Sequence, residues 1–318
     1  MKKQSNCVNA PFVTSTRLRW PFLRAIVIAA LSFPLVGLTT ARSPARSAPQ
    51  EPRPKQNRTL VCVVSRGDSS AESQGNMDAV VLVENGKLKQ PYPEYNEAAQ
   101  RKFAGQYFAP GKKYRVTFGG GEVGSATVKG SDMGCNNIHA TALVEDNGKI
   151  PAHLSALATD SDSLGRKPSA RRAPTDPERQ AAMKLVTQIY RSRSTTPALL
   201  RTLKTTNLTA TDLDGDGKFE LIGSFVIETK TKARRDLLLI AEPQGESYKA
   251  ALVNFQSYKL PPEGFDSAVD FVDQLDLDGD GIAEVFVQQH GFDAYGYSIY
   301  KKSGGRWRQV YTATGDAC

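Results

Sequence analysis

Two short acidic segments carry the clearest chemistry in this sequence. They read Asp-Leu-Asp-Gly-Asp-Gly-Lys-Phe-Glu at Asp212–Glu220 and Asp-Leu-Asp-Gly-Asp-Gly-Ile-Ala-Glu at Asp276–Glu284, so they differ only at the seventh and eighth positions. Carboxylates this close together repel one another unless a cation neutralises them. Calcium prefers about six to eight oxygen ligands in flexible geometry, whereas magnesium resists dehydration and prefers a strict octahedron. The two segments therefore predict two Ca2+ sites.

Each position of the motif has a physical role in such a site. Asp at the first, third and fifth positions aims carboxylates into a tightly curved loop, and the intervening glycines permit that curvature. The backbone carbonyl at the seventh position and the final Glu complete the shell. The predicted ligands are Asp212, Asp214, Asp216, Lys218 and Glu220 in the first loop, and Asp276, Asp278, Asp280, Ile282 and Glu284 in the second.

The motif has two other interpretations, an EF-hand and a solvated turn. An EF-hand needs a bidentate acid at the twelfth position, where this chain has Gly223 or Val287, and a helix after the loop. A solvated turn is the alternative for a single loop, since Asp and Gly are ordinary turn residues. Two near-identical copies at equivalent positions favour metal binding.

The loops need strands on both sides to hold them. Apolar and β-branched residues predict strands at 207–213, 219–229, 236–242 and 248–254, and again at 269–275, 283–289, 295–301 and 306–312. Each unit is then a four-stranded antiparallel meander, with its acidic loop between the first two strands. The first Asp of each loop lies 64 residues from its counterpart, which suits one β-blade per repeat.

The motif and its setting resemble the calcium loop of FG-GAP and VCBS-type repeats, which build the propellers of integrin α-subunits and of many bacterial surface proteins. The resemblance covers residues 205–318 only. It implies blade-like units that bind calcium through the Asp and Glu residues named above. Propellers close with about four to eight blades. With two copies, the meanders are expected to pack face to face or against the helix at 177–192, without closing a propeller.

The rest of the chain divides by composition into further segments. A basic stretch followed by the apolar run Ala25–Leu38 predicts a signal peptide at 1–41, because the run is short for a membrane span of about 20 residues. An uncleaved anchor is the alternative. The remaining segments are a disordered linker at 42–58, a β-rich domain at 59–158, a linker at 159–175, a helical segment at 176–204 and the two-repeat calcium-binding β domain at 205–318.

The predicted fold class is mostly β with a few helices. A small β-rich N-terminal domain precedes the two four-stranded meanders. Asp176 is the predicted N-cap of the first helix in the helical segment, with Pro177 at its first position. Gly119–Gly124 matches a dinucleotide-binding pattern, but the residues after it favour a strand, so the pattern predicts a glycine-rich hairpin.

The cysteines allow one disulfide in an oxidising compartment. After signal cleavage three remain: Cys62, Cys135 and Cys318. We expect Cys62 to pair with Cys135, because both lie in the predicted N-terminal domain. The other two pairings and three free thiols stay open.

The net charge of +8 does not indicate nucleic-acid binding. Ten basic residues and one acid lie before residue 59, so the rest of the chain is nearly neutral. We therefore expect no nucleic acid as a partner, and no membrane span once the signal is removed. The expected location is exported: periplasmic, extracellular or at the cell surface.

The sequence favours a binding protein over an enzyme. It has no His-Glu-x-x-His, Gly-x-Ser-x-Gly or Cys-x-x-Cys motif. Late aromatics line the β core, or Tyr295 and Tyr297 form a ligand surface with Arg306 and Arg308, suited to a glycan or peptide. We predict an exported calcium-binding β-repeat protein that acts as a binding or surface-interaction module for an unknown protein or glycan. The alternative is a secreted hydrolase with its active site in residues 59–158 and the repeats as an accessory module.

Overall fold

The computed structural model describes residues 58–66, 72–229, 233–259, 268–291 and 293–317. The predicted signal peptide at 1–41 and residues 42–57 of the predicted linker lie outside the described residues. The described chain is mostly β with three helices, as the sequence predicts. In this part of the chain, no helix has both the length and the apolar character needed to cross a bilayer.

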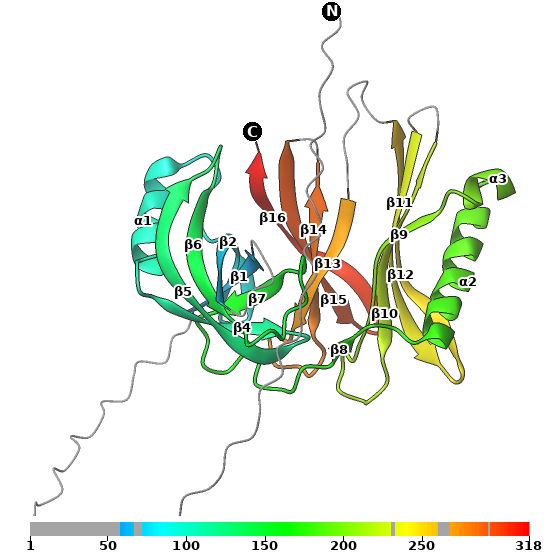
Figure 1. The fold of residues 1–318 in the computed structure, drawn as a ribbon, viewed down its shortest axis with the longest axis horizontal. Coiled ribbons are helices and arrows are strands. Elements are labelled where there is room, and N and C mark those ends of the chain that lie inside the picture. Colours follow the sequence, from blue (N-terminus) through cyan, green and yellow to red (C-terminus); the bar gives the residue numbers. More distant parts are fainter. Residues whose placement is uncertain (1–57, 67–71, 230–232, 260–267, 292, 318) are drawn as a thin grey trace, which may run out of the picture. The chain divides into compact units, whose positions relative to one another are not determined.

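The N-terminal strands close into a six-stranded barrel. The strand order is β1-β7-β4-β5-β6-β2, and antiparallel pairing of β1 with β2 closes the ring, while β3 extends β2 as a hairpin. The elements are β1 (Arg58–Arg66), β2 (Glu72–Glu84), β3 (Lys87–Lys89), α1 (Glu97–Tyr107), β4 (Lys113–Phe118), β5 (Gly121–Met133), β6 (Ile138–Glu145) and β7 (Ala156–Thr159). The buried side of α1 packs into the barrel core (Figure 1).

The first strand explains why the barrel does not stand alone. Its five central residues are all buried, although successive side chains of a strand point to opposite faces. Leu60, Cys62 and Val64 face the barrel core, whereas Val61 and Val63 pack with residues of the C-terminal strands. A strand that is buried on both faces reads in sequence as an uninterrupted apolar run.

The glycine-rich segment is a hairpin, as expected. Gly119 and Gly120 have φ angles of 64° and 76° and form the turn between β4 and β5. A Cβ atom at Gly121 would lie 2.3 Å from the backbone nitrogen of Ser169. Close approach of a neighbouring segment therefore accounts for these glycines, and no helix follows them to hold a nucleotide phosphate.

The C-terminal part contains the two predicted meanders. The first sheet has the order β12-β11-β10-β9-β8 and the second β13-β14-β15-β16, and each acidic loop joins the first two strands of its meander. The strands are β8 (Arg171–Arg172), β9 (Lys204–Thr211), β10 (Glu220–Glu228), β11 (Ala233–Gln244), β12 (Ser247–Lys259), β13 (Ala268–Leu275), β14 (Glu284–His290), β15 (Ala294–Ser303) and β16 (Arg306–Ala317). The predicted architecture is confirmed.

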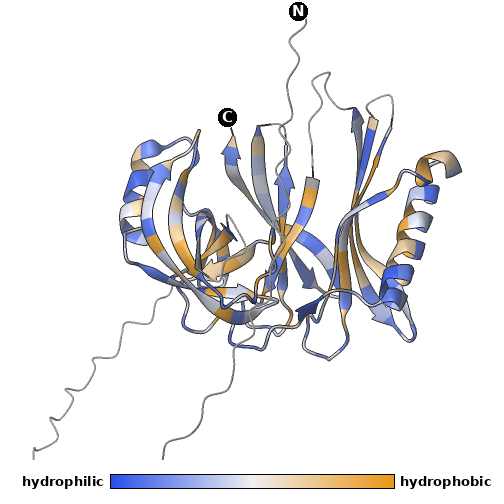
Figure 2. Ribbon diagram, in the orientation of Figure 1, coloured by the Kyte–Doolittle hydropathy of each residue, from blue (hydrophilic) through white to orange (hydrophobic). Residues whose placement is uncertain are grey.

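Three apolar interfaces stack these sheets into layers. The second sheet packs on the barrel through residues such as Phe286 and Ile299. The two meanders pack face to face through a core that includes Ile222, Ile240 and Val285. Helix α2 (Asp176–Ser192) covers the other face of the first sheet. Both expected packing arrangements are therefore present, and Figure 2 shows apolar residues concentrated on these strands.

The start of α2 differs by one residue from the prediction. Thr175, not Asp176, is the N-cap: its hydroxyl accepts from the backbone of Glu178, whose side chain accepts from the backbone of Thr175. This reciprocal capping box satisfies two free amide groups of the first turn. Asp176 occupies the first helical position instead. The short helix α3 (Pro197–Leu200) follows, capped by Thr196.

The predicted pairing of Cys62 with Cys135 is wrong. Cys62 is a free thiol inside the barrel, where burial raises its pKa, whereas Cys135 is disulfide-bonded. The physical reason is the strand direction: Cys62 points into the apolar core from β1, and Cys135 lies in the exposed turn between β5 and β6. Cys318 lies outside the described residues.

Candidate functional site

The first Asp of each acidic loop accepts an equivalent pair of backbone hydrogen bonds. Asp212 accepts from the backbone of Gly215 at 2.7 Å and of Gly217 at 3.0 Å. Asp276 accepts from Gly279 and Gly281 at 2.8 and 3.1 Å. The first carboxylate of each motif thus curls the loop around itself. The motif therefore encodes one backbone shape, which appears twice.

The glycines supply the conformation that this curvature requires. Gly215 and Gly217 have φ angles of 75° and 80°, and Gly279 and Gly281 have 77° and 91°. Residues with a side chain rarely adopt such angles. The predicted role of the glycines is confirmed.

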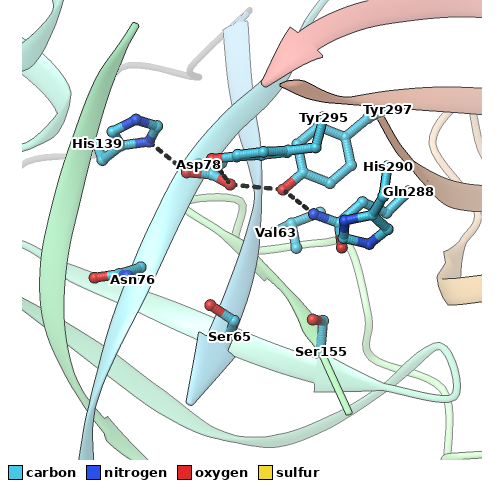
Figure 3. A pocket seen from close by; sticks show the side chains of 10 residues that line it. All are labelled: Val63, Ser65, Asn76, Asp78, His139, Ser155, Gln288, His290, Tyr295 and Tyr297. Atoms are coloured by element: carbon cyan, nitrogen blue, oxygen red, sulfur yellow. Dashed lines mark hydrogen bonds and ion pairs between the residues drawn. The ribbon is translucent and has the colours of Figure 1, made fainter. Parts of the chain in front are cut away.

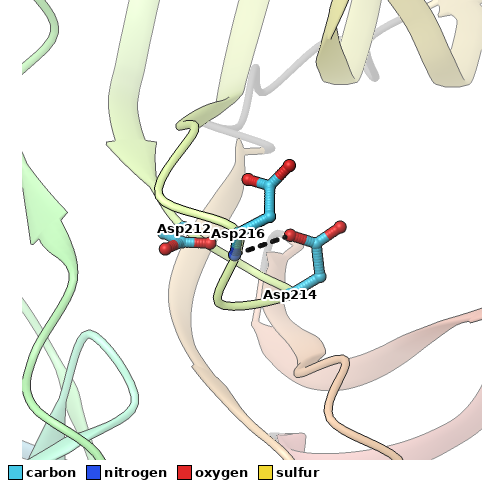
Figure 4. A group of neighbouring side chains, drawn as sticks. All are labelled: Asp212, Asp214 and Asp216. Carbon is cyan, nitrogen blue, oxygen red and sulfur yellow. Dashed lines mark hydrogen bonds between the residues drawn. The ribbon is translucent and has the colours of Figure 1, made fainter.

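The loop curvature gathers three carboxylates in each repeat. Oxygen atoms of Asp212, Asp214 and Asp216 lie within 4.8 Å of one another, as do those of the second triplet at 276, 278 and 280. Figure 4 shows the first triplet around its turn. These groups could hold a metal ion, because a divalent cation would neutralise charges that otherwise repel.

The final glutamates occupy the start of each second strand, as predicted. Glu220 accepts from the backbone of Leu213 at 2.9 Å, and Glu284 accepts from Leu277 at 2.8 Å. Both are buried, and burial raises the pKa of Glu220 to about 7. Burial also raises the pKa of Glu284, against the opposing effect of a nearby lysine. Desolvation thus makes each glutamate favour a proton or a cation.

A lysine ammonium group lies inside the second loop. Lys301 Nζ lies 2.7 Å from Asp278 Oδ2, 2.8 Å from Asp280 Oδ2 and 2.8 Å from Glu284 Oε1. Its three carboxylate partners raise its pKa, although burial alone would lower it. Sequence analysis placed residue 301 in a strand and gave it no role. The contacts bring three predicted ligands around one cationic atom.

The first loop contains a weaker version of this contact. Lys218 lies 3.1 Å from Asp216 and its side chain is 69% exposed. Lys302, the neighbour of Lys301, points to the opposite face of β15 and pairs with Glu242 at 2.8 Å. Among the described residues, no lysine joins three carboxylates of the first loop.

The loops are neighbours in space. Ala283 donates from its backbone to the carbonyl of Leu213 at 2.7 Å, and Gln274 donates to the carbonyl of Asp212 at 3.2 Å. A pocket of about 470 Å³ lies beside them and is lined by Asp212 and Asp276, among other residues. The predicted carbonyl ligands at Lys218 and Ile282 stay predictions, although the backbone nitrogens of both bond to the preceding Asp.

A second polar cluster was missed by sequence analysis. His139 Nδ1 lies 2.7 Å from Asp78, and its Nε2 lies 3.1 Å from Asp316. The hydrogen bond to Asp78 raises the pKa of His139 to about 9, although burial opposes this. Asp78 also accepts from Tyr295 at 3.0 Å and from Tyr297 at 2.6 Å. No local motif could have revealed a cluster whose members are this far apart in the sequence.

This cluster forms part of a pocket between the barrel and the second meander (Figure 3). The pocket has a volume of about 330 Å³. Tyr295 and Tyr297, which the sequence offered as core or ligand-binding residues, both line it, whereas Arg306 and Arg308 are exposed on β16 and do not. The two tyrosines and the two arginines therefore do not form one ligand surface.

Comparisons with protein-family models, with curated proteins and with solved structures find no match for this chain.

Proposed function

We propose that this protein binds two calcium ions, one in each acidic loop, and that it is an exported β-repeat protein acting as a binding or surface-interaction module. The observation that carries the proposal is the Lys301 ammonium group among Asp278, Asp280 and Glu284. It marks a position where oxygen ligands from the middle and the last position of the motif converge on a positive charge. The first loop has the same acids and the same backbone hydrogen bonds to its first Asp.

The donor set favours calcium over other metals. Side-chain ligands in both loops are carboxylates, which suit hard cations, and neither motif contains His or Cys. The exposed, glycine-rich loops allow the flexible coordination that calcium accepts and magnesium does not. The resemblance to FG-GAP and VCBS-type loops between the strands of a meander supports the same metal.

Calcium in these loops would act on the interface between the meanders. Each loop leads into the strand that carries the shared core, and the loops bond to each other through Ala283 and Leu213. An ion that neutralises one loop also fixes the start of the strand that follows it. We therefore assign calcium a structural role, in which it holds the two sheets in their packed arrangement.

A binding role fits the pocket chemistry better than a hydrolytic one. A general base must be able to take up a proton near neutral pH. His139 lies between two carboxylates, and its raised pKa keeps it protonated there. This observation favours a structural role for the histidine in the barrel and a binding role for the module.

Calcium titration by isothermal calorimetry tests the proposal. The metal-free wild type should bind two ions, with dissociation constants on the order of 10⁻⁴ to 10⁻³ M, as in extracellular modules. Asp216→Asn and Asp280→Asn should each remove one site, and the double variant should remove both. Glu246→Gln, in the exposed turn between β11 and β12, is the matched control and should keep both. Equal heats from the wild type and the double variant would overturn the proposal.

A further inference from the structure

The pocket between the barrel and the second meander has the form of a small-molecule site. Strands β1, β2 and β6 and residue Ser155 line one part of it, and β14 and β15 line the rest. Its volume of about 330 Å³ lies near the lower end of the range of about 300–1,000 Å³ for ligand pockets. A site of this size suits a single sugar-sized ring better than an extended peptide.

The walls of the pocket are close to neutral. Asp78 is the one carboxylate among the described lining residues, and none of them is Lys or Arg. Its oxygens already accept from His139, Tyr295 and Tyr297, and the His139 imidazolium is shared between Asp78 and Asp316. An anionic ligand would have to compete with these two carboxylates for the imidazolium, and a cationic ligand would compete with three donors for one carboxylate.

The remaining polar groups are hydroxyls, amides and the imidazole of His290. Figure 3 shows Ser65, Asn76 and Ser155 on one side of the space, with Gln288 and His290 across from them beside the tyrosines. Hydroxyl and amide groups can both donate and accept hydrogen bonds. This pattern matches a ligand with several hydroxyl groups, each of which also donates and accepts.

Aromatic rings complete the match. The rings of Tyr295 and Tyr297 meet edge to face at 5.9 Å, and their hydroxyls are anchored on Asp78. Because the hydroxyls are fixed, the rings are held rigid and lose little conformational entropy when a ligand binds. A rigid aromatic surface facing hydroxyl and amide groups presents both an apolar and a polar side, as the faces and edges of a sugar ring require.

We propose that this pocket binds a neutral carbohydrate, namely one sugar ring, either free or at the end of a glycan. The inference rests on the proposed role as a binding module, and it is independent of calcium because neither acidic loop lines the pocket. Tyr295 and Gln288 are the proposed specificity-determining residues. Tyr295 would contact the apolar face of the sugar, and the amide of Gln288 would bond to its hydroxyl groups.

Saturation-transfer NMR on the full chain, followed by calorimetry, provides the test. The neutral probes are glucose, galactose, mannose and N-acetylglucosamine, and the charged probes are glucuronate, glucosamine and glucose 6-phosphate. We expect saturable binding of at least one neutral probe, and at least tenfold weaker binding of its charged counterpart. An immobilised glycan array separates the two sources: binding on the array with no binding of the free sugar assigns the site to a glycan end.

Variants tie the binding to the pocket. Gln288→Ala, which truncates a half-buried side chain, should weaken binding at least tenfold. Tyr295→Phe keeps the ring but loses its anchor on Asp78, so it should weaken binding modestly, whereas Tyr295→Ala should abolish it. Gln256→Ala on β12 and Tyr95→Ala, where the side chain is 76% exposed, are the matched controls and should bind normally.

The proposal is overturned if no neutral sugar binds in solution or on the array, or if binding is unchanged in Gln288→Ala and Tyr295→Ala. Tighter binding of a charged probe would also contradict it, because the argument depends on neutral walls. Adding calcium or a chelator should leave the affinity of the folded protein unchanged. If the wild type binds no sugar but is still stabilised by calcium, the carbohydrate proposal is refuted and the calcium proposal stands.

Discussion

Carboxylates gather in two regions of this molecule, and the protein neutralises them differently. At the interface between barrel and meander, Asp78 and Asp316 share the imidazolium of His139, and two tyrosines donate to Asp78 as well. In the acidic loops, by contrast, three carboxylates lie within 4.8 Å of one another. Protein donors satisfy the carboxylates at the interface, whereas the loops hold more acids than the lysines beside them neutralise, so we propose an external cation there.

The two loops also differ from each other, although their sequences are nearly identical. In the second loop Lys301 contacts three acids, while in the first the exposed Lys218 contacts one. The cause lies outside the motif, in the residue that β15 places beside the loop. A binding motif therefore specifies a loop shape, and the neighbouring strand decides how much charge is left for an ion.

Calcium removal should give the largest effect of all. The proposed calcium sites exist in the folded loops and not in the unfolded chain, so at 100 times the dissociation constant each site should add about 2.7 kcal/mol. For a chain of this size that corresponds to roughly 5–10 °C per site in the unfolding midpoint. Differential scanning calorimetry with chelator and with saturating calcium measures the shift. An identical midpoint in both conditions would mean that the loops are solvated turns.

The interface cluster should respond to pH and not to calcium. The pKa of His139 is raised to about 9, from an unfolded value of about 6.5. Its contribution is therefore complete below pH 6.5 and is lost as the pH rises through 9, a loss on the order of 3 kcal/mol. Chemical denaturation of the wild type and of His139→Gln between pH 6 and pH 10 measures it. The variant should be less stable at pH 6 and show a flatter profile, and parallel profiles would contradict the assignment.

Replacing Lys301 should make the second loop behave like the first. Lys301→Met leaves three acids without their ammonium partner, so the metal-free protein should lose about 2 kcal/mol. The affinity of the second loop for calcium should then rise about tenfold, because the ion no longer displaces the lysine. Lys218→Met removes an exposed pair and should change stability much less, because solvent screens that pair. Calcium titrations of both variants measure the contrast. If the second loop binds calcium equally well in Lys301→Met and in Lys218→Met, the prediction is contradicted.

The buried glutamates should show the smallest difference. Burial raises the pKa of Glu220 to about 7, so the metal-free fold loses stability as the pH rises from 4.5 through 7, where the folded glutamate loses its proton. Glu220→Gln should remove this dependence and raise metal-free stability by about 1 kcal/mol at pH 8. Glu284→Gln should give a smaller gain, since Lys301 offsets part of the cost of burying that carboxylate. Metal-free denaturation curves at pH 5 and pH 8 compare the two variants.

The sequence by itself determined the local structure around the loops. Alternating apolar residues located both meanders, and the Asp and Gly positions specified loops whose hydrogen bonds and φ angles follow the motif. Interactions between residues close in sequence depend on the backbone conformation that those residues favour. For that reason the loops, the glycine-rich hairpin and the capped helices could be predicted to within a few residues.

Only the tertiary structure decided the partners across the chain. Asp78, His139 and Asp316 lie on three strands whose register and packing bring them together, and no periodicity encodes that meeting. The side of β15 that presents Lys301, and the strand face that buries Cys62, were likewise settled by how the sheets stack. The physical reason is that long-range contacts depend on the combined packing of all the layers, whereas a turn depends on a few adjacent residues.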